Sequence, residues 1–426
     1  MPPHLLAPQE ARDARTRPRG SAPINRFVAV IGDKSPTLKN RLAIVATIGL
    51  TQTLAWASSF YLPAVLAIPI AHDIGLSTPW IYAALSLGLG VSAVLGPLLG
   101  RWIDGHGGRP VLCGSNVAFA AGLCSLALAG GPVSLILAWL VLGVAMAAGL
   151  YESAFASLTR LYGHDSRGAI TGITLVAGFA STVGWPISAL LEHSMGWRGT
   201  CAAWAALHLF LGLPLNAWAM RYGKGEERHG SAVSGKRPAL PDASDRSMLI
   251  LAFMFTASGI VTTGMATNLP RLFAAMGAAP TAAIAAASML GPAQVAARVL
   301  EFSARRRINP LISARIASAL HPLASLTIAV GGAPVIAAFS ILHGAGTGML
   351  TITRGTLPLA LYGPSGYGAR IGRIAAPARI GQALAPFLFG LAIEKLGGTT
   401  LVISSGLSLA ALLALSWLTL PFVPKA

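Results

Sequence analysis

The chain has 426 residues, of which 54% are hydrophobic and only 11% are charged. An average soluble domain carries a charged residue at about one position in four, so this composition excludes an ordinary soluble enzyme. The formal charge of +17 would fit a nucleic-acid partner, unless the basic residues are distributed in a way that explains it otherwise.

Residues 1–40 are polar, rich in Arg and Pro, and lack the apolar core of a secretory signal peptide. They are predicted to form a disordered cytoplasmic tail. Apolar segments follow that are long enough to cross a hydrocarbon core of ~30 Å as helices. The twelve segments are 41–69, 79–100, 110–130, 133–159, 168–192, 199–220, 248–270, 280–302, 309–330, 333–356, 373–393 and 399–420. The predicted fold class is therefore an all-α membrane protein with twelve transmembrane helices.

Twelve spans place both termini on one side of the membrane, and the positive-inside rule selects that side. With the termini inside, the outer loops carry only three basic residues, Arg198, Arg271 and Lys395. We therefore predict a multi-pass protein of the bacterial inner membrane with both termini in the cytoplasm. Cytoplasmic arginines fix the topology and contact anionic lipid headgroups, which explains the net charge without nucleic acid.

The segment 221–247 is the longest polar stretch inside the chain and follows the sixth span. It is predicted to be a cytoplasmic linker between two six-helix bundles, 41–220 and 248–420, with a short tail at 421–426. A repeat supports this division. Residues Leu161, Tyr162, Gly163, Gly168, Ala169, Gly172 and Pro186 recur two hundred positions later as Leu361, Tyr362, Gly363, Gly368, Ala369, Gly372 and Pro386. Duplication of a six-helix unit produces such a repeat.

A glycine-rich loop follows the second span and reads Gly-Arg-Trp-Ile-Asp-Gly-His-Gly-Gly-Arg-Pro-Val-Leu from residue 100 to residue 112. It resembles the signature loop of the major facilitator superfamily, G-x-L-a-D-R-x-G-R-K-x-x-L. The matching residues are Gly100, Asp104, Gly107, Arg109 and Leu112. The resemblance implies the fold of that family, in which two six-helix bundles enclose a substrate site near the membrane midplane.

The same resemblance implies that Asp104 and Arg109 are gate residues on the cytoplasmic side. An Asp at a helix end can pair with a loop Arg or with the N-terminus of a neighbouring helix. Gly105 and Gly108 stand where the family usually carries a basic residue, so a differently paired latch is expected.

Ionisable residues inside spans are costly, and each is a functional candidate. Glu152 lies about two turns inside the cytoplasmic end of the fourth span and is predicted to be a protonatable coupling residue. A structural ion pair of Glu152 with Arg160 or Arg167 remains an alternative. Arg354 in the tenth span is a second candidate partner for Glu152 and a candidate substrate ligand. Arg379 is expected to cap the cytoplasmic start of span 11.

The eighth span places Gln294 and Arg298 four residues apart, on one helix face. This segment is similar to the eighth span of monocarboxylate-transporter-type members, where an acid and an arginine at this spacing serve coupling and carboxylate binding. Gln294 replaces the acid, which leaves Arg298 free to bind an anion and moves proton coupling to Glu152 or elsewhere. A gate role for Arg298, beside Glu301, stays equally open.

Polar and aromatic residues of several spans are predicted to line the substrate cavity, because pockets use few polar groups among apolar walls. They are Gln52, Trp56, Tyr61, Tyr151, Trp185, Thr262, Thr263 and Asn268.

No catalytic, metal or cofactor site is predicted, because the three cysteines form no CxxC pair and the nine histidines form no ligand motif. The sequence therefore predicts a non-enzymatic, monomeric secondary transporter whose partners are a small-molecule solute, protons and membrane lipid. The two intramembrane arginines favour a small organic anion moved by proton-linked alternating access. Efflux of a toxic compound, such as a drug or arsenite, remains the alternative.

Overall fold

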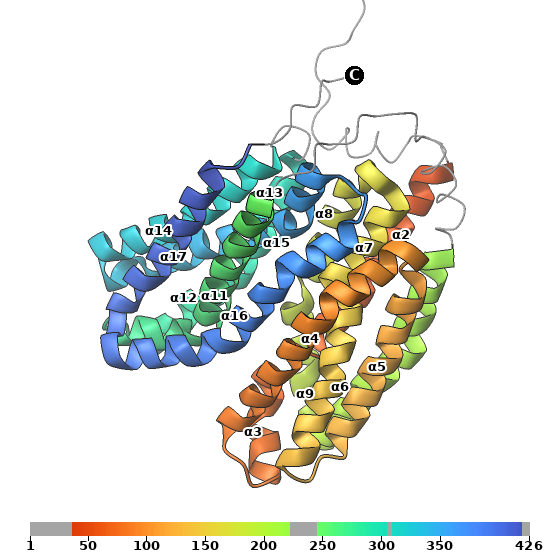
Figure 1. Ribbon diagram of the computed structural model, residues 1–426. Helices are drawn as coiled ribbons and strands as arrows, with labels where there is room; N and C mark the ends of the chain where they lie inside the picture. Colours follow the sequence, from red (N-terminus) through yellow and green to blue (C-terminus); the bar gives the residue numbers. More distant parts are fainter. Residues whose placement is uncertain (1–35, 222–244, 305–308, 420–426) are drawn as a thin grey trace, which may run out of the picture. The chain divides into compact units, whose positions relative to one another are not determined.

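The computed structural model describes residues 36–221, 245–304 and 309–419. The predicted N-terminal tail before residue 36, the linker between 222 and 244 and the tail 421–426 lie outside these described residues. Every regular element in the described ranges is a helix (Figure 1), as the composition predicts. Residues from Ala43 onward form one compact unit.

The longer helices of the first half of the chain are α2 (Pro36–Ala57), α3 (Pro63–Asp73), α4 (Thr78–His106), α5 (Arg109–Ala127), α6 (Pro132–Gly149), α7 (Tyr151–Tyr162), α8 (Ser166–Ala177) and α9 (Ala180–Leu207). A π-helix, η2 (His208–Gly212), follows α9, and residues 213–221 are helical. The longer helices of the second half are α11 (Asp245–Ala275), α12 (Pro280–Ser288), α13 (Leu290–Ala304), α14 (Pro310–Gly331), α15 (Ile336–Tyr362), α16 (Tyr367–Leu396) and α17 (Thr400–Ser416). Short 3-10 turns are η1 (Gly163–Asp165), η3 (Ala333–Val335) and η4 (Gly397–Thr399).

Eight helical stretches in the described part of the chain are long and apolar enough to cross a membrane. Two of them, 132–221 and 367–416, are 90 and 50 residues long, whereas one crossing needs about 20 residues. Within the first, Gly196 has a φ of 70°, which turns the chain between the predicted fifth and sixth spans. The protein is therefore a multi-pass membrane protein, and the figure of twelve crossings stays a prediction.

Several predicted apolar segments are not single helices. The first is interrupted between α2 and α3, where Pro63 begins a new helix, and the fifth is interrupted between α8 and α9. The fourth is interrupted at Leu150, whose ψ of −171° is extended, and the eighth is interrupted at Met289. Breaks of this kind free backbone carbonyls inside the protein, where polar side chains can use them.

Glycines allow the helices to approach closely. A Cβ on Gly372 of α16 would lie 2.7 Å from the main-chain oxygen of Gly96 of α4, so these two helices touch through their backbones. Gly100 and Gly368 meet in the same way, one turn nearer the ends of the helices. Small residues commonly mediate such contacts between membrane helices. As a result, α4 of the first half and α16 of the second half lie side by side (Figure 1).

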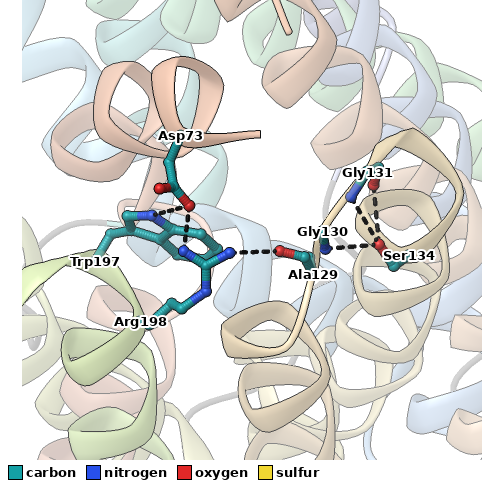
Figure 2. Close-up of polar contacts among 7 residues, drawn as sticks. All are labelled: Asp73, Ala129, Gly130, Gly131, Ser134, Trp197 and Arg198. Atoms are coloured by element: carbon teal, nitrogen blue, oxygen red, sulfur yellow. Dashed lines mark hydrogen bonds and ion pairs between the residues drawn. The ribbon is translucent and has the colours of Figure 1, made fainter. Parts of the chain in front are cut away.

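A group of polar contacts, which we call the clasp, joins α3, α9 and the connection between α5 and α6 (Figure 2). It lies on the side of the first half that we predict to face outward. Asp73, the last residue of α3, forms an ion pair with Arg198 and accepts a hydrogen bond of 3.3 Å from Trp197 Nε1. Arg198 also donates to the carbonyl of Ala129, which precedes α6. The hydrogen bond from Arg198 lowers the pKa of the Asp73 carboxyl below its ordinary value. The clasp therefore fixes α3 against α9 and the α5–α6 connection.

Candidate functional site

Asp104, near the end of α4, caps the first turn of α16. Its Oδ1 accepts a hydrogen bond of 2.8 Å from the N–H of Gly368, and its Oδ2 accepts one of 2.9 Å from the N–H of Ala369. The first N–H groups of a helix have no partner within the helix, and its positive dipole end attracts a carboxylate. Asp104 therefore links the two halves of the chain at the helix ends that we predict to face the cytoplasm.

The loop around Asp104 explains one departure from the family pattern. A side chain at Gly108 would collide with Ser157 of α7, so the loop has no room there for the usual basic residue. Arg160 donates a hydrogen bond to the main-chain oxygen of Asp104. Arg109 begins α5, and no ion pair between Arg109 and Asp104 is present among the described residues. The gate roles of Asp104 and Arg109 stay predictions.

Glu152 forms an ion pair with Arg379, with 2.7 Å between Oε2 and Nη2. Both side chains are shielded from solvent, with 19% and 4% of their surfaces exposed. Because the chain restarts as a helix after Leu150, Glu152 lies in the first turn of α7, where the helix dipole favours a carboxylate. The fourth predicted span is therefore two helices, α6 and α7, and the coupling role of Glu152 stays a prediction.

Two predictions about these charges are wrong. The hydrogen-bonded partner of Glu152 is Arg379 and not Arg354. Arg379 does not cap the start of span 11, because α16 begins at Tyr367 and places Arg379 about three turns inside the helix.

Arg298 on α13 is 5% exposed and has no carboxylate partner among the described residues. Its Nη2 donates hydrogen bonds of 3.4 Å to Gln294 Oε1 and 3.2 Å to Thr351 Oγ1, which confirms that Gln294 and Arg298 share a helix face. Within the described ranges, its Nε and Nη1 have no hydrogen-bond partner. The guanidinium lies against Gly178, at the break between α8 and α9. Arg298 is thus a buried cation with donors left for a ligand.

Arg354 on α15 lies beside Gly259 of α11 and Gln382 of α16. It also lies within electrostatic range of both members of the Glu152–Arg379 pair. We call Arg298, Arg354, Arg379 and Glu152 the arginine cluster. Three guanidinium groups and one carboxylate leave an excess of positive charge, which an anionic ligand would neutralise.

An aromatic wall adjoins the arginine cluster. The Trp56 ring lies 5.0 Å from that of Tyr151 and 6.1 Å from that of Tyr61, and the Tyr61 ring lies 6.0 Å from that of Trp185. The Arg379 guanidinium lies 5.6 Å from the centre of the Trp56 ring, within cation–π range. Tyr61 and Tyr151 are within electrostatic range of Arg298 and Arg354. The predicted liners Tyr61, Tyr151 and Trp185 are therefore grouped by the structure.

Two other predicted liners have different surroundings. Gln52 is buried, and its Nε2 donates a hydrogen bond of 2.6 Å to the main-chain oxygen of Gly149, which the break at Leu150 frees. Gln52 thus holds the last residue of α6, next to the start of α7 that carries Glu152. Asn268 donates to the main-chain oxygens of Gly264 and Pro386, and no described hydrogen bond joins it to the arginine cluster.

Sequence reasoning missed the role of Arg379 and the histidine pair formed by His321 and His343, which are buried and bonded to each other. The repeat could have indicated the position of Arg379. It places Gly368 at the start of the helix, and Arg379 follows about three helical turns later, inside the span. No sequence signal pairs the two histidines, because they lie on different helices and form no ligand motif.

A model of the Major Facilitator Superfamily matches residues 48–332, which is more than half of the chain. The chain belongs to the Major Facilitator Superfamily. Its members are transporters of small-molecule solutes, so the family resemblance of the loop at 100–112 is confirmed. No curated protein sequence matches the chain.

Its fold is similar to that of many solved structures. The human organic anion transporter MFSD10 (TETRAN) is 17% identical, with a TM-score of 0.65 over 89% of this chain and 100% of that one. The proton:xylose symporter XylE bound to 6-bromo-6-deoxy-D-glucose is 14% identical, with a TM-score of 0.64 over 88% and 94% of the two chains. The likeness to monocarboxylate-transporter-type members stays a prediction.

Proposed function

We propose that this superfamily member moves a small organic anion across the bacterial inner membrane by proton-linked alternating access. The observation that carries this proposal is the excess of arginine over carboxylate in the arginine cluster, where Arg298 keeps two unpaired donor groups. A buried guanidinium without an anion is costly, and a carboxylate can accept two of its N–H groups at once. The likeness to a human organic anion transporter supports the same solute class.

The aromatic wall would hold the body of the solute. Trp56, Tyr61, Tyr151 and Trp185 offer ring faces and edges beside the arginines. Pockets for small molecules combine apolar walls with few charged groups that orient the ligand. A carboxylate attached to an apolar or aromatic body fits this combination better than a sugar or an inorganic ion.

Glu152 is the proposed coupling residue. While ionised, it pairs with Arg379 and neutralises that cation. Protonation of Glu152 would break the pair and leave Arg379 free to bind the anion, so that one proton and one anion are bound together. The likeness to a proton:xylose symporter supports proton linkage.

Alternating access would arise from two six-helix bundles, 41–220 and 248–420, that move against each other with 221–247 as their linker. Asp104 is the proposed gate residue. Opening of the predicted cytoplasmic end must separate Asp104 from the N–H groups of Gly368 and Ala369. The substrate would then be released on that side as the site closes on the other.

The test uses purified protein in liposomes with an inward proton gradient. The labelled probes are benzoate and lactate as carboxylates, xylose as a neutral solute, and tetraphenylphosphonium and arsenite as toxic compounds. We expect accumulation of a carboxylate, lowered at least about tenfold by Arg298→Ala, because a buried charge-assisted contact contributes about 1.5–3 kcal/mol.

Arg315→Ala is the matched control. Arg315 is also an arginine within a predicted span, but its guanidinium donates to main-chain oxygens of Leu415 and Leu418 at the end of α17. Its replacement should leave carboxylate accumulation within about twofold of wild type. Transport of tetraphenylphosphonium or arsenite without carboxylate transport would favour the efflux alternative and overturn the anion proposal.

A further inference from the structure

A buried histidine pair lies in the second half, apart from the arginine cluster. His321 of α14 and His343 of α15 approach with 2.8 Å between their Nδ1 atoms. They are 4% and 2% exposed, and the ring of Phe339 stacks on His343. Two imidazoles at this distance share one hydrogen, so one Nδ1 donates and the other accepts.

The hydrogen bonds around the pair indicate which ring donates. His321 Nε2 lies 2.9 Å from Ser404 Oγ, so both ring nitrogens of His321 are hydrogen-bonded. His343 Nε2 has no hydrogen-bond partner among the described residues. A buried N–H without a partner is rarer than a buried acceptor without one, so we assign the ring hydrogen of His343 to Nδ1. This assignment makes His343 Nδ1 the donor to His321 and leaves a free lone pair on His343 Nε2.

His343 lines a small polar cavity between α11, α14, α15 and α17. Besides the two histidines, its polar lining consists of Ser258, Thr262, Ser318, Thr347 and Ser408. The Ser318 hydroxyl also lacks a hydrogen-bond partner within the described part of the chain, so the cavity contains polar groups that these residues do not satisfy.

No lining residue from α11, α14, α15 or α17 is charged, and the two histidines are the only titratable groups among them. The cations on the helices that line the cavity include Arg315, which donates to main-chain oxygens at the end of α17, and Arg354 of the arginine cluster, three turns along α15. His343 Nε2 is therefore the basic atom of this cavity.

A polar face of α15 connects the cavity to the arginine cluster. Thr347 donates to the main-chain oxygen of His343, and Thr351 donates to that of Thr347, each at 3.0 Å. Thr351 in turn accepts from Arg298 Nη2 at 3.2 Å. Four-residue steps keep His343, Thr347 and Thr351 on one face, over about 12 Å. A positive charge on His343 would therefore lie on the same face of α15 as Thr351, the residue that accepts a hydrogen bond from Arg298.

We propose that His343 Nε2 is a proton-binding site of the second half, additional to Glu152, and that its protonation acts on anion binding through the Thr347–Thr351 face of α15. The Nε2 lone pair takes up a proton from water that reaches the cavity, which forms an imidazolium, and the proton returns to water after the transporter changes state. This inference rests on the proposed proton-linked function, because it assigns where a coupled proton is held.

His208 provides a matched control in the first half. It is buried like His343, but its Nε2 lies 2.8 Å from Ser58 Oγ and its Nδ1 lies 3.0 Å from Asn116 Oδ1. Both ring nitrogens are occupied, so no free lone pair is available. The structure therefore separates a histidine that can take up a proton from one that serves packing.

The first experiment does not require a known substrate. Protein with ¹⁵N-labelled histidine in lipid nanodiscs is titrated by NMR from about pH 8 to about pH 3.5, because burial disfavours the imidazolium and a buried histidine takes up its proton at a lower pH than an exposed one. The resonances are assigned by their loss in His343→Gln, in His343→Asn if that variant folds better, and in His208→Gln.

We expect His343 Nε2 to be unprotonated at the alkaline end and to take up a proton reversibly, while His208 stays unchanged. An Nε2 that carries a proton throughout, or that remains unprotonated throughout, would overturn the proposal.

The second experiment uses liposomes and the carboxylate that wild-type protein carries. His343→Gln should lower accumulation driven by a proton gradient at least about tenfold and keep carboxylate exchange at equal pH within about twofold. Accumulation equal to wild type would overturn the proposal and leave the proposed function standing. If wild-type protein carries no carboxylate, the proposed function fails, and the NMR titration still decides whether His343 binds a proton.

Discussion

Glu152 and Arg379 are 227 positions apart in the chain and form a shielded ion pair of 2.7 Å between α7 and α16. The pair joins the two halves beside Trp56, whose ring lies under the Arg379 guanidinium. Because each half contributes one charge, any movement that separates α7 from α16 must first neutralise or solvate both groups.

Replacement of one member of this pair should cost more than replacement of both. Glu152→Gln leaves Arg379 as an unpaired buried cation, and loss of one partner of a buried pair typically costs about 3–5 kcal/mol. The double variant Glu152→Gln with Arg379→Gln removes both charges and should recover most of that stability. Melting temperatures of the three proteins in detergent measure the effect, with the exposed Glu394→Gln as control. Additive losses in the double variant would contradict the pairing.

Gly100→Ala should disturb the contact between α4 and α16. A Cβ at this position would strike the main-chain carbonyl of Gly368, so the two helices must separate. Overpacking of this kind costs about 1–3 kcal/mol, which would favour the state that is open at the predicted cytoplasmic end. Labelling of an added cysteine at Ser157, beside the loop, should become faster than in the parent carrying the same cysteine.

Gly105→Ala is the control for this change, because a Cβ there meets no other atom within 4 Å. Equal labelling rates for the two glycine variants would argue against a tight closure at Gly100.

Gly178→Ala should weaken carboxylate binding although it replaces no charged residue. The Arg298 guanidinium occupies the space that a Cβ at Gly178 would need, so the arginine must shift from its present position. A shift of about 1 Å in a positioning contact can reduce transport by as much as about a hundredfold. Initial rates of carboxylate uptake measure it, beside Gly114→Ala, where the added Cβ has open space. Unchanged uptake in Gly178→Ala would show that Arg298 does not bind the carboxylate.

The clasp at Asp73 should give the protein a pH-dependent contribution to stability. The hydrogen bond from Arg198 lowers the pKa of Asp73 in the folded protein relative to the unfolded chain, so the carboxylate stabilises the fold above its ordinary pKa of about 3.9. This contribution is lost as the pH falls through the lowered pKa. The difference in melting temperature between wild type and Asp73→Asn should therefore stay constant from about pH 7 to about pH 5 and shrink below about pH 4. A difference that grows on acidification would contradict the sign of this linkage.

Part of this picture is determined locally. Long apolar runs with few charges require helices in a membrane, because no other open structure satisfies the backbone in lipid. The glycine-rich loop at 100–112 indicates the family, and the structure places its Asp104 at a helix N-terminus, one of the two partners that the sequence allows. The i, i+4 spacing of Gln294 and Arg298 likewise predicts their hydrogen bond.

Other features depend on contacts between segments that are distant in the chain. The apolar runs do not indicate these contacts, because positions that face lipid and positions that face other helices are both hydrophobic. The helix break at Leu150 is stabilised by Gln52 of another helix, and the partner of Glu152 comes from the other half of the chain. Arg379 lies inside α16 and not at its start, because α16 begins six residues before the predicted edge of that span. The histidine pair required α14 and α15 to pack with His321 facing His343. The sequence by itself determined a helical transporter with costly charges in its spans, and tertiary packing alone decided which of those charges meet, because that depends on the rotation and breaks of helices far apart in the chain.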